Sequence, residues 1–292
     1  MIIIIRDEIN FYGALFKSGM YEIKSGQSID LLKELHILTQ DGKMNQDSRR
    51  KLKQVYHLYQ FIEPLLQEIK QDNRSIQLVD HGAGKSYLGF ILYDLFFKAL
   101  NDASHIYCIE TRDNLVKYSQ ALASRLNFPG MSFLNLSVEQ SIESKALPTK
   151  VNVVTALHAC NTATDDAIRF ALKKNAQFIA LVPCCQAEIA AVLKKNKNKD
   201  LAKNVLIDLW RHPIHTREFG SHITNVLRCL QLEAHGYQVT VTELVGWEHS
   251  MKNELIIANF KNLPCNRPAE RLKEMLQTLG LQEMSSRFFT RI

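Results

Sequence analysis

The stretch Ile76–Gly89, with the sequence IQLVDHGAGKSYLG, contains the pattern that decides the fold. A short apolar run ends at Asp80, glycines follow at Gly82 and Gly84, and apolar residues recur at helical spacing from Leu88 onward. This pattern predicts a strand, a glycine turn and a helix. Glycine permits a positive φ and lets a ligand lie against bare backbone, and the N–H groups at the start of the helix can bind an anionic group.

Two nucleotide-binding motifs match this turn only in part. The dinucleotide fingerprint G-x-G-x-x-G needs a glycine where Tyr87 stands. The phosphate-binding loop G-x-x-x-x-G-K-[ST] needs one where Val79 stands, although Gly84, Lys85 and Ser86 match its end. Asp80 stands two positions before the first glycine. With it, the stretch instead resembles the first motif of class I S-adenosylmethionine (SAM) methyltransferases, (D/E)-x-G-x-G-x-G, with Ser86 in place of the last glycine. A tight turn without a ligand is the alternative interpretation.

The composition indicates a globular protein with a mildly basic surface. Of 292 residues, 46% are hydrophobic, and the net charge of +6 permits a nucleic-acid partner without requiring one. The apolar start Met1–Ile5 is too short for a signal peptide or a membrane span, so we expect no membrane contact. Cysteines lie mostly in apolar runs, which favours free thiols in the cytoplasm: they stand at positions 108, 160, 184, 185, 229 and 265.

Three segments are expected along the chain: a helical extension over residues 1–73, an α/β domain over 74–262 and a helical tail over 263–292. In the extension, apolar residues recur at helical spacing over 28–38 and again after Asp47, which we expect to cap the second helix. The opposite face of that helix is either a solvated surface or a phosphate-binding patch, and it carries Arg49, Arg50, Lys51 and Lys53.

Strands and helices alternate after Ile76, which is typical of a doubly wound α/β sheet. After the first strand, apolar runs predict strands over residues 105–109, 131–136, 151–157, 177–182, 237–245 and 255–260. The link between the last two is too short for a parallel crossover, which needs roughly a dozen residues. We therefore expect the sheet to end in an antiparallel hairpin.

Candidate site residues follow the predicted strands, because ligands bind at the carboxyl ends of strands in open α/β sheets. The first strand leads to Asp80 and the glycine turn. The second ends at Glu110, whose carboxylate can accept hydrogen bonds from two ribose hydroxyls. The third is followed by Ser137 and Val138, which are positioned to border an adenine ring.

Unusual sequences follow the fourth and fifth predicted strands. Residues 157–165 read LHACNTATD, and residues 182–186 read VPCCQ. If the two strands are neighbours, their ends bring together His158, Cys160, Cys184 and Cys185.

These two sequences resemble a subgroup of class I methyltransferases with an LHACG-x-ATD motif and a downstream PCC, often called methyltransferase domain family 32. The subgroup includes the eukaryotic tRNA 2′-O-methyltransferase of the acceptor stem. LRCLQLEAHGY at 227–237 and EHSMKN at 248–253 extend the resemblance, which covers roughly residues 51–260. It implies a seven-stranded, Rossmann-like sheet and SAM as cofactor, with a cofactor site that includes Asp80, Gly82, Gly84, Lys85, Glu110, Ser137, Val138 and His158.

The resemblance makes His158, Cys184 and Asn161 the candidate catalytic residues, although Asn161 replaces a glycine of the motif. His158 can act as general base or position the substrate. Cys184 can act as the nucleophile of C5-pyrimidine methylation, and a zinc site can be drawn from His158, Cys160 and the paired cysteines. Buried packing is the commonest fate of such cysteines. We expect packing for the cysteines, a positioning role for His158 and no metal.

The sequence thus predicts a SAM-dependent methyltransferase whose acceptor is RNA, either tRNA or rRNA. The basic balance, the lysine-rich stretch over 194–204 and the tRNA-modifying member of the subgroup favour this acceptor. A protein or small-molecule acceptor is the alternative. A non-catalytic scaffold that binds SAM or a nucleotide is a further one.

Overall fold

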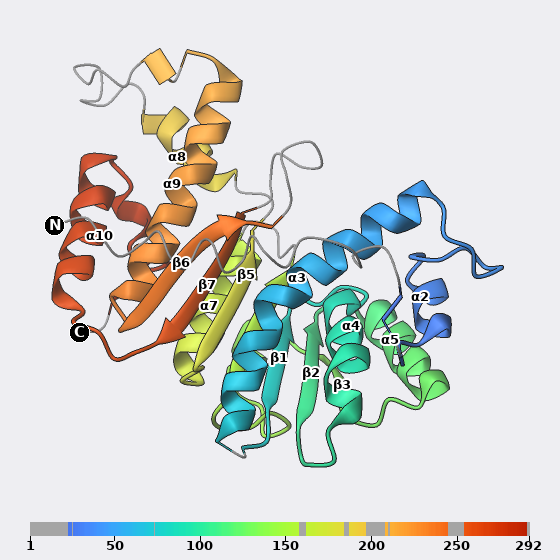
Figure 1. Cartoon of the computed structure of the whole chain (residues 1–292). Coiled ribbons are helices and arrows are strands. Elements are labelled where there is room, and N and C mark those ends of the chain that lie inside the picture. Colours follow the sequence, from blue (N-terminus) through green and yellow to red (C-terminus); the bar gives the residue numbers. More distant parts are fainter. Residues whose placement is uncertain are drawn as a thin grey trace, which may run out of the picture. The chain divides into compact units, whose positions relative to one another are not determined.

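The computed structural model describes residues 23–24, 26–72, 74–157, 162–183, 187–196, 208–209, 211–244 and 254–290 (Figure 1). The chain divides into two compact units, residues 1–61 and 62–292. The boundary falls within one long helix, α3 (Gln46–Gln71).

The N-terminal unit contains α2 (Ile29–Glu34) and the first part of α3. The Ser28 hydroxyl caps α2 by accepting a hydrogen bond from the Leu31 N–H at 3.2 Å. At the start of α3, the Asn45 side chain accepts a hydrogen bond from the Ser48 N–H at 2.8 Å. The expectation that Asp47 caps this helix is therefore wrong, because the helix begins one residue before Asp47 and Asn45 holds the capping position.

The second unit is built on one seven-stranded sheet with the order β3-β2-β1-β4-β5-β7-β6. The strands are β1 (Gln77–His81), β2 (His105–Glu110), β3 (Met131–Asn135), β4 (Val153–Leu157), β5 (Phe178–Val182), β6 (Tyr237–Glu243) and β7 (Glu254–Phe260). The first five strands are parallel to one another, and β7 is antiparallel to both β5 and β6. The predicted doubly wound sheet with a final antiparallel hairpin is confirmed.

Helices cover both faces of this sheet. One face carries α4 (Tyr87–Leu95) and α5 (Asp113–Leu126), and a short 3-10 turn over Phe97–Ala99 follows α4. Gly89 allows α4 to approach β2 closely, since a Cβ there would lie 2.7 Å from the Cys108 sulfur. The other face carries α6 (Val138–Glu143) and α7 (Thr162–Lys173), whose apolar residues join Val79 and Val154 in the main core.

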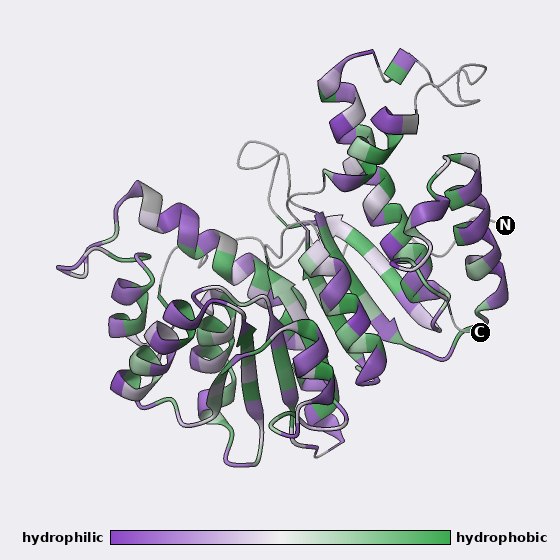
Figure 2. Ribbon diagram, turned by 180° about the vertical axis from the view of Figure 1, so that it is seen from behind, coloured by the Kyte–Doolittle hydropathy of each residue, from purple (hydrophilic) through white to green (hydrophobic). Residues whose placement is uncertain are grey.

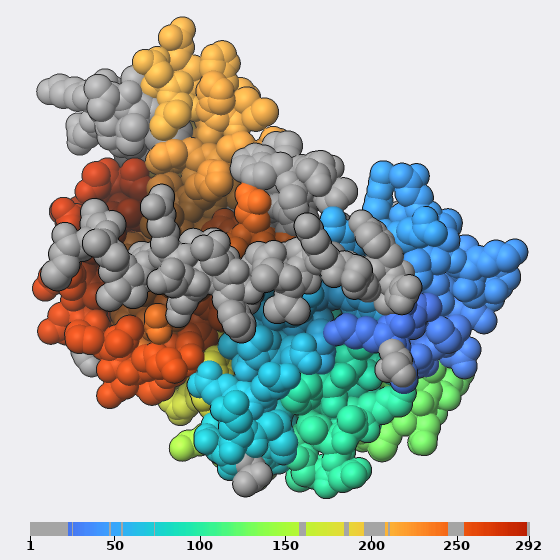
Figure 3. All heavy atoms as spheres, in the orientation of Figure 1, coloured from blue at the N-terminus to red at the C-terminus, as the bar shows by residue number. Residues whose placement is uncertain are grey.

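The last part of the chain forms a helical layer with a core of its own. It comprises α8 (Glu188–Asn196), α9 (Pro213–Glu233), α10 (Asn266–Thr278) and a 3-10 turn over Gln282–Met284. Figure 3 shows the surface of α10 (red) beside that of α9 (orange). In Figure 2, hydrophobic residues concentrate along the parallel strands, while the helices turn hydrophilic residues outward.

The segment 287–290 is fixed to α9 by specific contacts. The Gln231 side-chain amide donates hydrogen bonds to the carbonyl oxygens of Arg287 and Phe289, at 3.0 and 3.3 Å. The Phe289 ring lies edge-on to the His235 ring, with centroids 5.4 Å apart. The Arg287 guanidinium pairs with Glu188 at the start of α8.

Candidate cofactor site

The turn between β1 and α4 has a left-handed backbone at every second residue. Gly82, Gly84 and Ser86 have φ values of 68°, 59° and 55°. The Ser86 N–H donates to the Ala83 carbonyl at 2.7 Å, and α4 begins at the next residue, Tyr87. A left-handed backbone is strained for residues other than glycine, which explains why the methyltransferase motif has glycine where this chain has Ser86.

Glu110, at the end of β2, is bonded to the glycine turn. Its carboxylate accepts hydrogen bonds from the Gly84 N–H at 2.8 Å and from the Arg112 N–H at 3.0 Å. The Arg112 guanidinium adds two more at 3.0 Å, one to each carboxylate oxygen. Burial alone raises the pKa of Glu110, but the Arg112 and Gly84 hydrogen bonds outweigh it and lower the pKa to about 2. The carboxylate is therefore ionised near neutral pH.

The structure thus brings Glu110 to the glycine turn, where a ribose-binding carboxylate is expected. A carboxylate has about four acceptor positions, and here four N–H groups fill them. The Glu110 side chain is 7% exposed and that of Arg112 is 63% exposed. A ribose could therefore reach Glu110 only by replacing its exposed partner, the Arg112 guanidinium. The sequence analysis did not identify Arg112. The available signal was its position two residues after Glu110.

Asp80 lies beneath the turn rather than on its surface. Its carboxylate is 2% exposed and accepts hydrogen bonds from the Thr155 hydroxyl, at 2.8 Å, and from the Gly89 backbone of α4. Burial raises the pKa of Asp80 to about 7, although the bonds from Thr155 and Gly89 oppose the rise. This geometry gives Asp80 a role in joining β1, β4 and α4, and its predicted contact with cofactor stays a prediction.

The remaining predicted residues of the cofactor site lie near the ends of β1 and β3. Lys85 is exposed, with its ammonium 5.9 Å from the centre of the Tyr118 ring. Ser137 caps α6 in a reciprocal pair with Gln140, and Val138, next to it, is buried. Their predicted contacts with cofactor also stay predictions.

The predicted catalytic residues lie outside the described residues, as do the cysteines that accompany them: these are His158, Cys160, Asn161, Cys184 and Cys185. The strands that lead to them are neighbours, as expected, and their pairing runs as far as Leu157 and Val182. The zinc alternative falls on the same undescribed residues. Within the described ranges, His, Cys, Asp and Glu form no group that can hold a metal ion.

Hydrogen bonds connect residues that lie in or beside three segments that carry the sequence resemblance. Asp165, at the end of LHACNTATD, accepts two hydrogen bonds from the Arg228 guanidinium, at 2.7 and 3.0 Å, and both side chains are buried. Arg228 belongs to LRCLQLEAHGY and also donates to the Asn225 side chain at 3.1 Å. Asn225 in turn donates to Glu254, the residue after EHSMKN, at 2.6 Å. The motif residues Asp165 and Arg228 thus hold α7 against α9.

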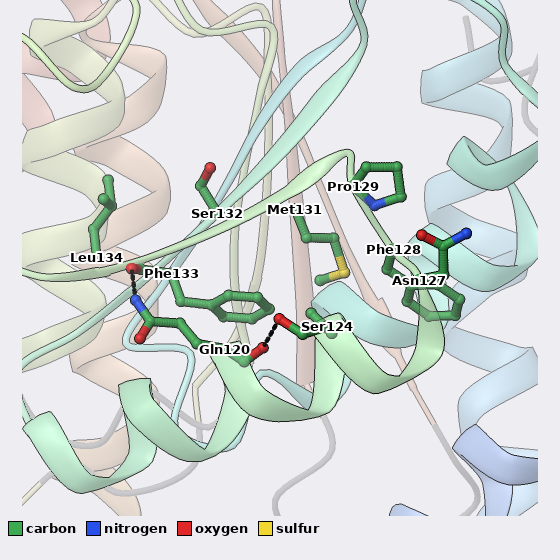
Figure 4. Close-up of a pocket in the computed structure, with 10 residues that line it drawn as sticks. Gln120, Ser124, Asn127, Phe128, Pro129, Met131, Ser132, Phe133 and Leu134 are labelled. Carbon is green, nitrogen blue, oxygen red and sulfur yellow. Dashed lines mark hydrogen bonds between the residues drawn. The ribbon is translucent and has the colours of Figure 1, made fainter.

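A pocket of about 410 Å³ lies away from this site, between α5 and the outermost strand β3 (Figure 4). It is lined by Gln120, Phe128, Met131 and Phe133, among others, and Gln120 donates a hydrogen bond to the Phe133 carbonyl at 3.1 Å. Because Asn127 and Pro129 lead into the amino end of β3, the pocket does not belong to the carboxyl edge where Glu110 lies.

The strand order, the glycine turn and the carboxylate at the end of β2 define a Rossmann-like methyltransferase fold. Residues 50–192 match the family model described as methyltransferase domain, Methyltransf_32. The fold and this match, which spans just under half of the chain, support a SAM-dependent methyltransferase domain with SAM as its cofactor.

Curated relatives of this chain include the glutathione S-transferase C-terminal domain-containing proteins of Bos taurus and Homo sapiens. Each is 23% identical over 234 residues, which is 74% of this chain and 34% of the relative. The chain thus spans about a third of the length of these relatives.

Solved structures similar to this chain include an rRNA methylase from Streptococcus thermophilus, with 11% identity and a TM-score of 0.39, which covers 65% of this chain and 88% of that one. Another is the S-adenosylhomocysteine-bound methyltransferase PaMTH1 of Podospora anserina, with 10% identity and a TM-score of 0.45, over 89% and 99%. Among the helices in the described ranges, none has the length and apolar character needed to span a membrane.

Proposed function

We propose that the protein transfers the methyl group of SAM to RNA, either tRNA or rRNA. The observation that carries the cofactor half of this proposal is the Glu110 carboxylate bonded to the glycine turn at Gly84. Its two oxygens suit the two hydroxyls of a ribose, and the turn offers bare backbone beside them. SAM supplies a methyl group activated by its sulfonium.

In this proposal each residue has a stated task. Glu110 accepts the ribose hydroxyls, while Gly82 and Gly84 leave room for the cofactor. His158 removes a proton from the methyl acceptor or orients that acceptor. Cys184 and Asn161 border the site where the acceptor binds. The roles of the last three rest on the sequence resemblance.

Calorimetric titration tests the cofactor. Wild type should bind SAM and S-adenosylhomocysteine but not NAD, and Glu110→Ala should lose at least about tenfold in affinity for both. Glu143→Ala, which removes an exposed carboxylate of α6, should bind as wild type does. Binding of NAD in place of SAM, or of none of the three, would contradict the proposal.

The RNA acceptor is supported by the net charge of +6 and by the basic residues in the first turns of α3, which are Arg49, Arg50, Lys51 and Lys53. Incubation with methyl-labelled SAM and total RNA should leave label in material that ribonuclease destroys. If Arg49 and Arg50 contact phosphates, changing both to alanine should weaken RNA binding and reduce its salt dependence.

The alternatives predict other outcomes in the same assay. A protein or small-molecule acceptor would put the label into protease-sensitive or low-molecular-weight material. A non-catalytic scaffold would bind SAM through Glu110 yet transfer no label, and His158→Ala would then change no activity. We also place the protein in the cytoplasm, a proposal supported by Cys108, Cys229 and Cys265, which are free thiols.

A further inference from the structure

His81, the last residue of β1, is a buried histidine with an unpaired ring. It is 5% exposed, and neither Nδ1 nor Nε2 has a hydrogen-bond partner in the part of the chain that the structure describes. The ring packs against Phe170 of α7, with centroids 5.5 Å apart. A neutral imidazole has one N–H donor and one acceptor, and burying such groups unpaired destabilises a fold. An apolar side chain in this place would avoid that cost.

His235 shows how the same fold treats a buried histidine with a structural role. It is also 5% exposed, and its Nδ1 lies 2.7 Å from the Gln231 carbonyl oxygen. Native proteins pair nearly all buried polar groups, so an exception needs its own explanation. The two histidines therefore form a matched pair, equal in burial and different in hydrogen bonding.

The charge state of His81 determines which hydrogen bonds its ring can donate and accept. Burial, with a smaller effect from the positive Arg169, lowers the pKa of His81 to about 4, although the negative Glu110 opposes this change. The ring is therefore neutral at physiological pH, with one nitrogen free to donate and the other free to accept.

His81 lies next to the candidate cofactor site. It stands inside the cofactor motif, between Asp80 and Gly82, and the register pairs it with Ile109, the residue before Glu110. β1 lies between β2, which carries Glu110, and β4, which precedes the predicted catalytic segment, so a cofactor that joins these two places must cross the end of β1. The amino-acid end of SAM carries a carboxylate that accepts hydrogen bonds and an ammonium that donates them, which matches a neutral imidazole.

We propose that the His81 side chain binds the amino-acid end of SAM and so contributes affinity for the cofactor through a ring that has no hydrogen-bond partner among the described residues. This inference rests on the proposed function, since it requires SAM at the glycine turn. His81 is a residue that sequence reasoning missed.

The test compares two ligands and two variants. S-adenosylhomocysteine has the amino-acid end, and adenosine lacks it. His81→Leu should lose about tenfold or more in affinity for S-adenosylhomocysteine and keep its affinity for adenosine. The same variant should melt at least about 2–4 °C higher without ligand, because it removes an unpaired buried group. His235→Leu should melt lower and keep both affinities.

The outcomes separate this inference from the function on which it rests. If wild type binds neither ligand, the proposed function is wrong. If wild type binds both and His81→Leu keeps the wild-type ratio of the two affinities, His81 is a packing residue and the inference is overturned. Should the leucine variant fail to fold, His81→Phe takes its place. His81→Gln, which keeps a donor and an acceptor, should retain more of the preference for S-adenosylhomocysteine than either apolar variant.

Discussion

At the scale of single residues, Arg112 occupies the carboxylate of Glu110 that the proposed function assigns to the ribose. The guanidinium donates one hydrogen bond to each oxygen of this carboxylate, so a ribose bound there would have to displace it. Its side chain is largely exposed, so water screens this ion pair and displacing it is inexpensive.

We predict that Arg112→Ala tightens binding of SAM and S-adenosylhomocysteine by about fivefold at low salt, because the variant has no guanidinium to displace. The gain should shrink as salt rises and screens the pair in wild type. Titration calorimetry at two salt concentrations measures this, with Arg125→Ala, an exposed arginine of α5, as the control for lost charge. Weaker binding by Arg112→Ala would mean that the guanidinium itself contacts the cofactor.

Asp80 makes stability depend on pH. Its ordinary pKa is 3.8 and burial raises the folded value to about 7, so the folded protein holds this proton over that range and the unfolded chain does not. Stability from this group is therefore greatest below about pH 4 and is lost as pH rises toward 7. Asp80→Asn, which stays neutral, should gain stability relative to wild type between pH 5 and pH 8, on the order of a few kcal/mol.

Urea unfolding at both pH values measures the Asp80 effect. Asp113→Asn, on the surface of α5, is the control. An equal difference between variant and wild type at pH 5 and pH 8 would show that Asp80 is ionised throughout this range.

At the scale of elements, Gly220 fixes the contact between α8 and α9. A Cβ at this position would lie 2.8 Å from the Ala190 backbone nitrogen and 3.0 Å from its Cα, so α8 would have to move away. Helix propensity alone makes Gly→Ala favourable by about 1 kcal/mol, so the two effects have opposite signs.

We predict that the steric effect wins and that Gly220→Ala destabilises the protein by about 1–3 kcal/mol. Urea unfolding measures this, and Ser221→Ala, at the next position of the same helix, is the control. A variant more stable than wild type would place the two helices farther apart than the structure does.

Several elements could be predicted from sequence because their signals are local. The antiparallel hairpin followed from a short link between two strands, and Glu110 followed from its place at the end of an apolar run. The capping residue of α3 was misassigned because Asn45 and Asp47 are both good caps, and the helical pattern does not fix the first residue.

At the scale of the whole molecule, Asp165 and Arg228 join segments 63 residues apart in the sequence. We predict that Arg228→Met destabilises the protein by about 3–5 kcal/mol, because it leaves the buried Asp165 carboxylate without both hydrogen bonds from Arg228, with only the more distant Arg287 nearby. The double variant Arg228→Met/Asp165→Leu should recover much of this loss, as measured by urea unfolding. Equal stability of the single and double variants would mean that Asp165 finds another partner.

Long-range contacts are what the sequence could not supply. Asp165 and Arg228 both belong to sequence motifs that were recognised, but no local sequence pattern indicates that their side chains bind each other. The burial of the His81 ring without a hydrogen-bond partner among the described residues, and the two bonds from the Arg112 side chain to Glu110, also depend on residues brought together by folding. The segments that follow β4 and β5 were recognised only by resemblance, and their roles remain predictions.

The bonds between segment 287–290 and α9 bear on how the protein is handled in the laboratory. Arg287 also approaches Asp165, at 3.9 Å, so this segment contacts the ion pair that holds α7, the helix that follows predicted catalytic residues in the sequence. Proteolytic clipping near residue 282 during purification would strip these contacts, and a loss of activity could follow with every predicted catalytic residue still present. The mass of the purified chain is therefore worth checking before an inactive preparation is taken as evidence against catalysis.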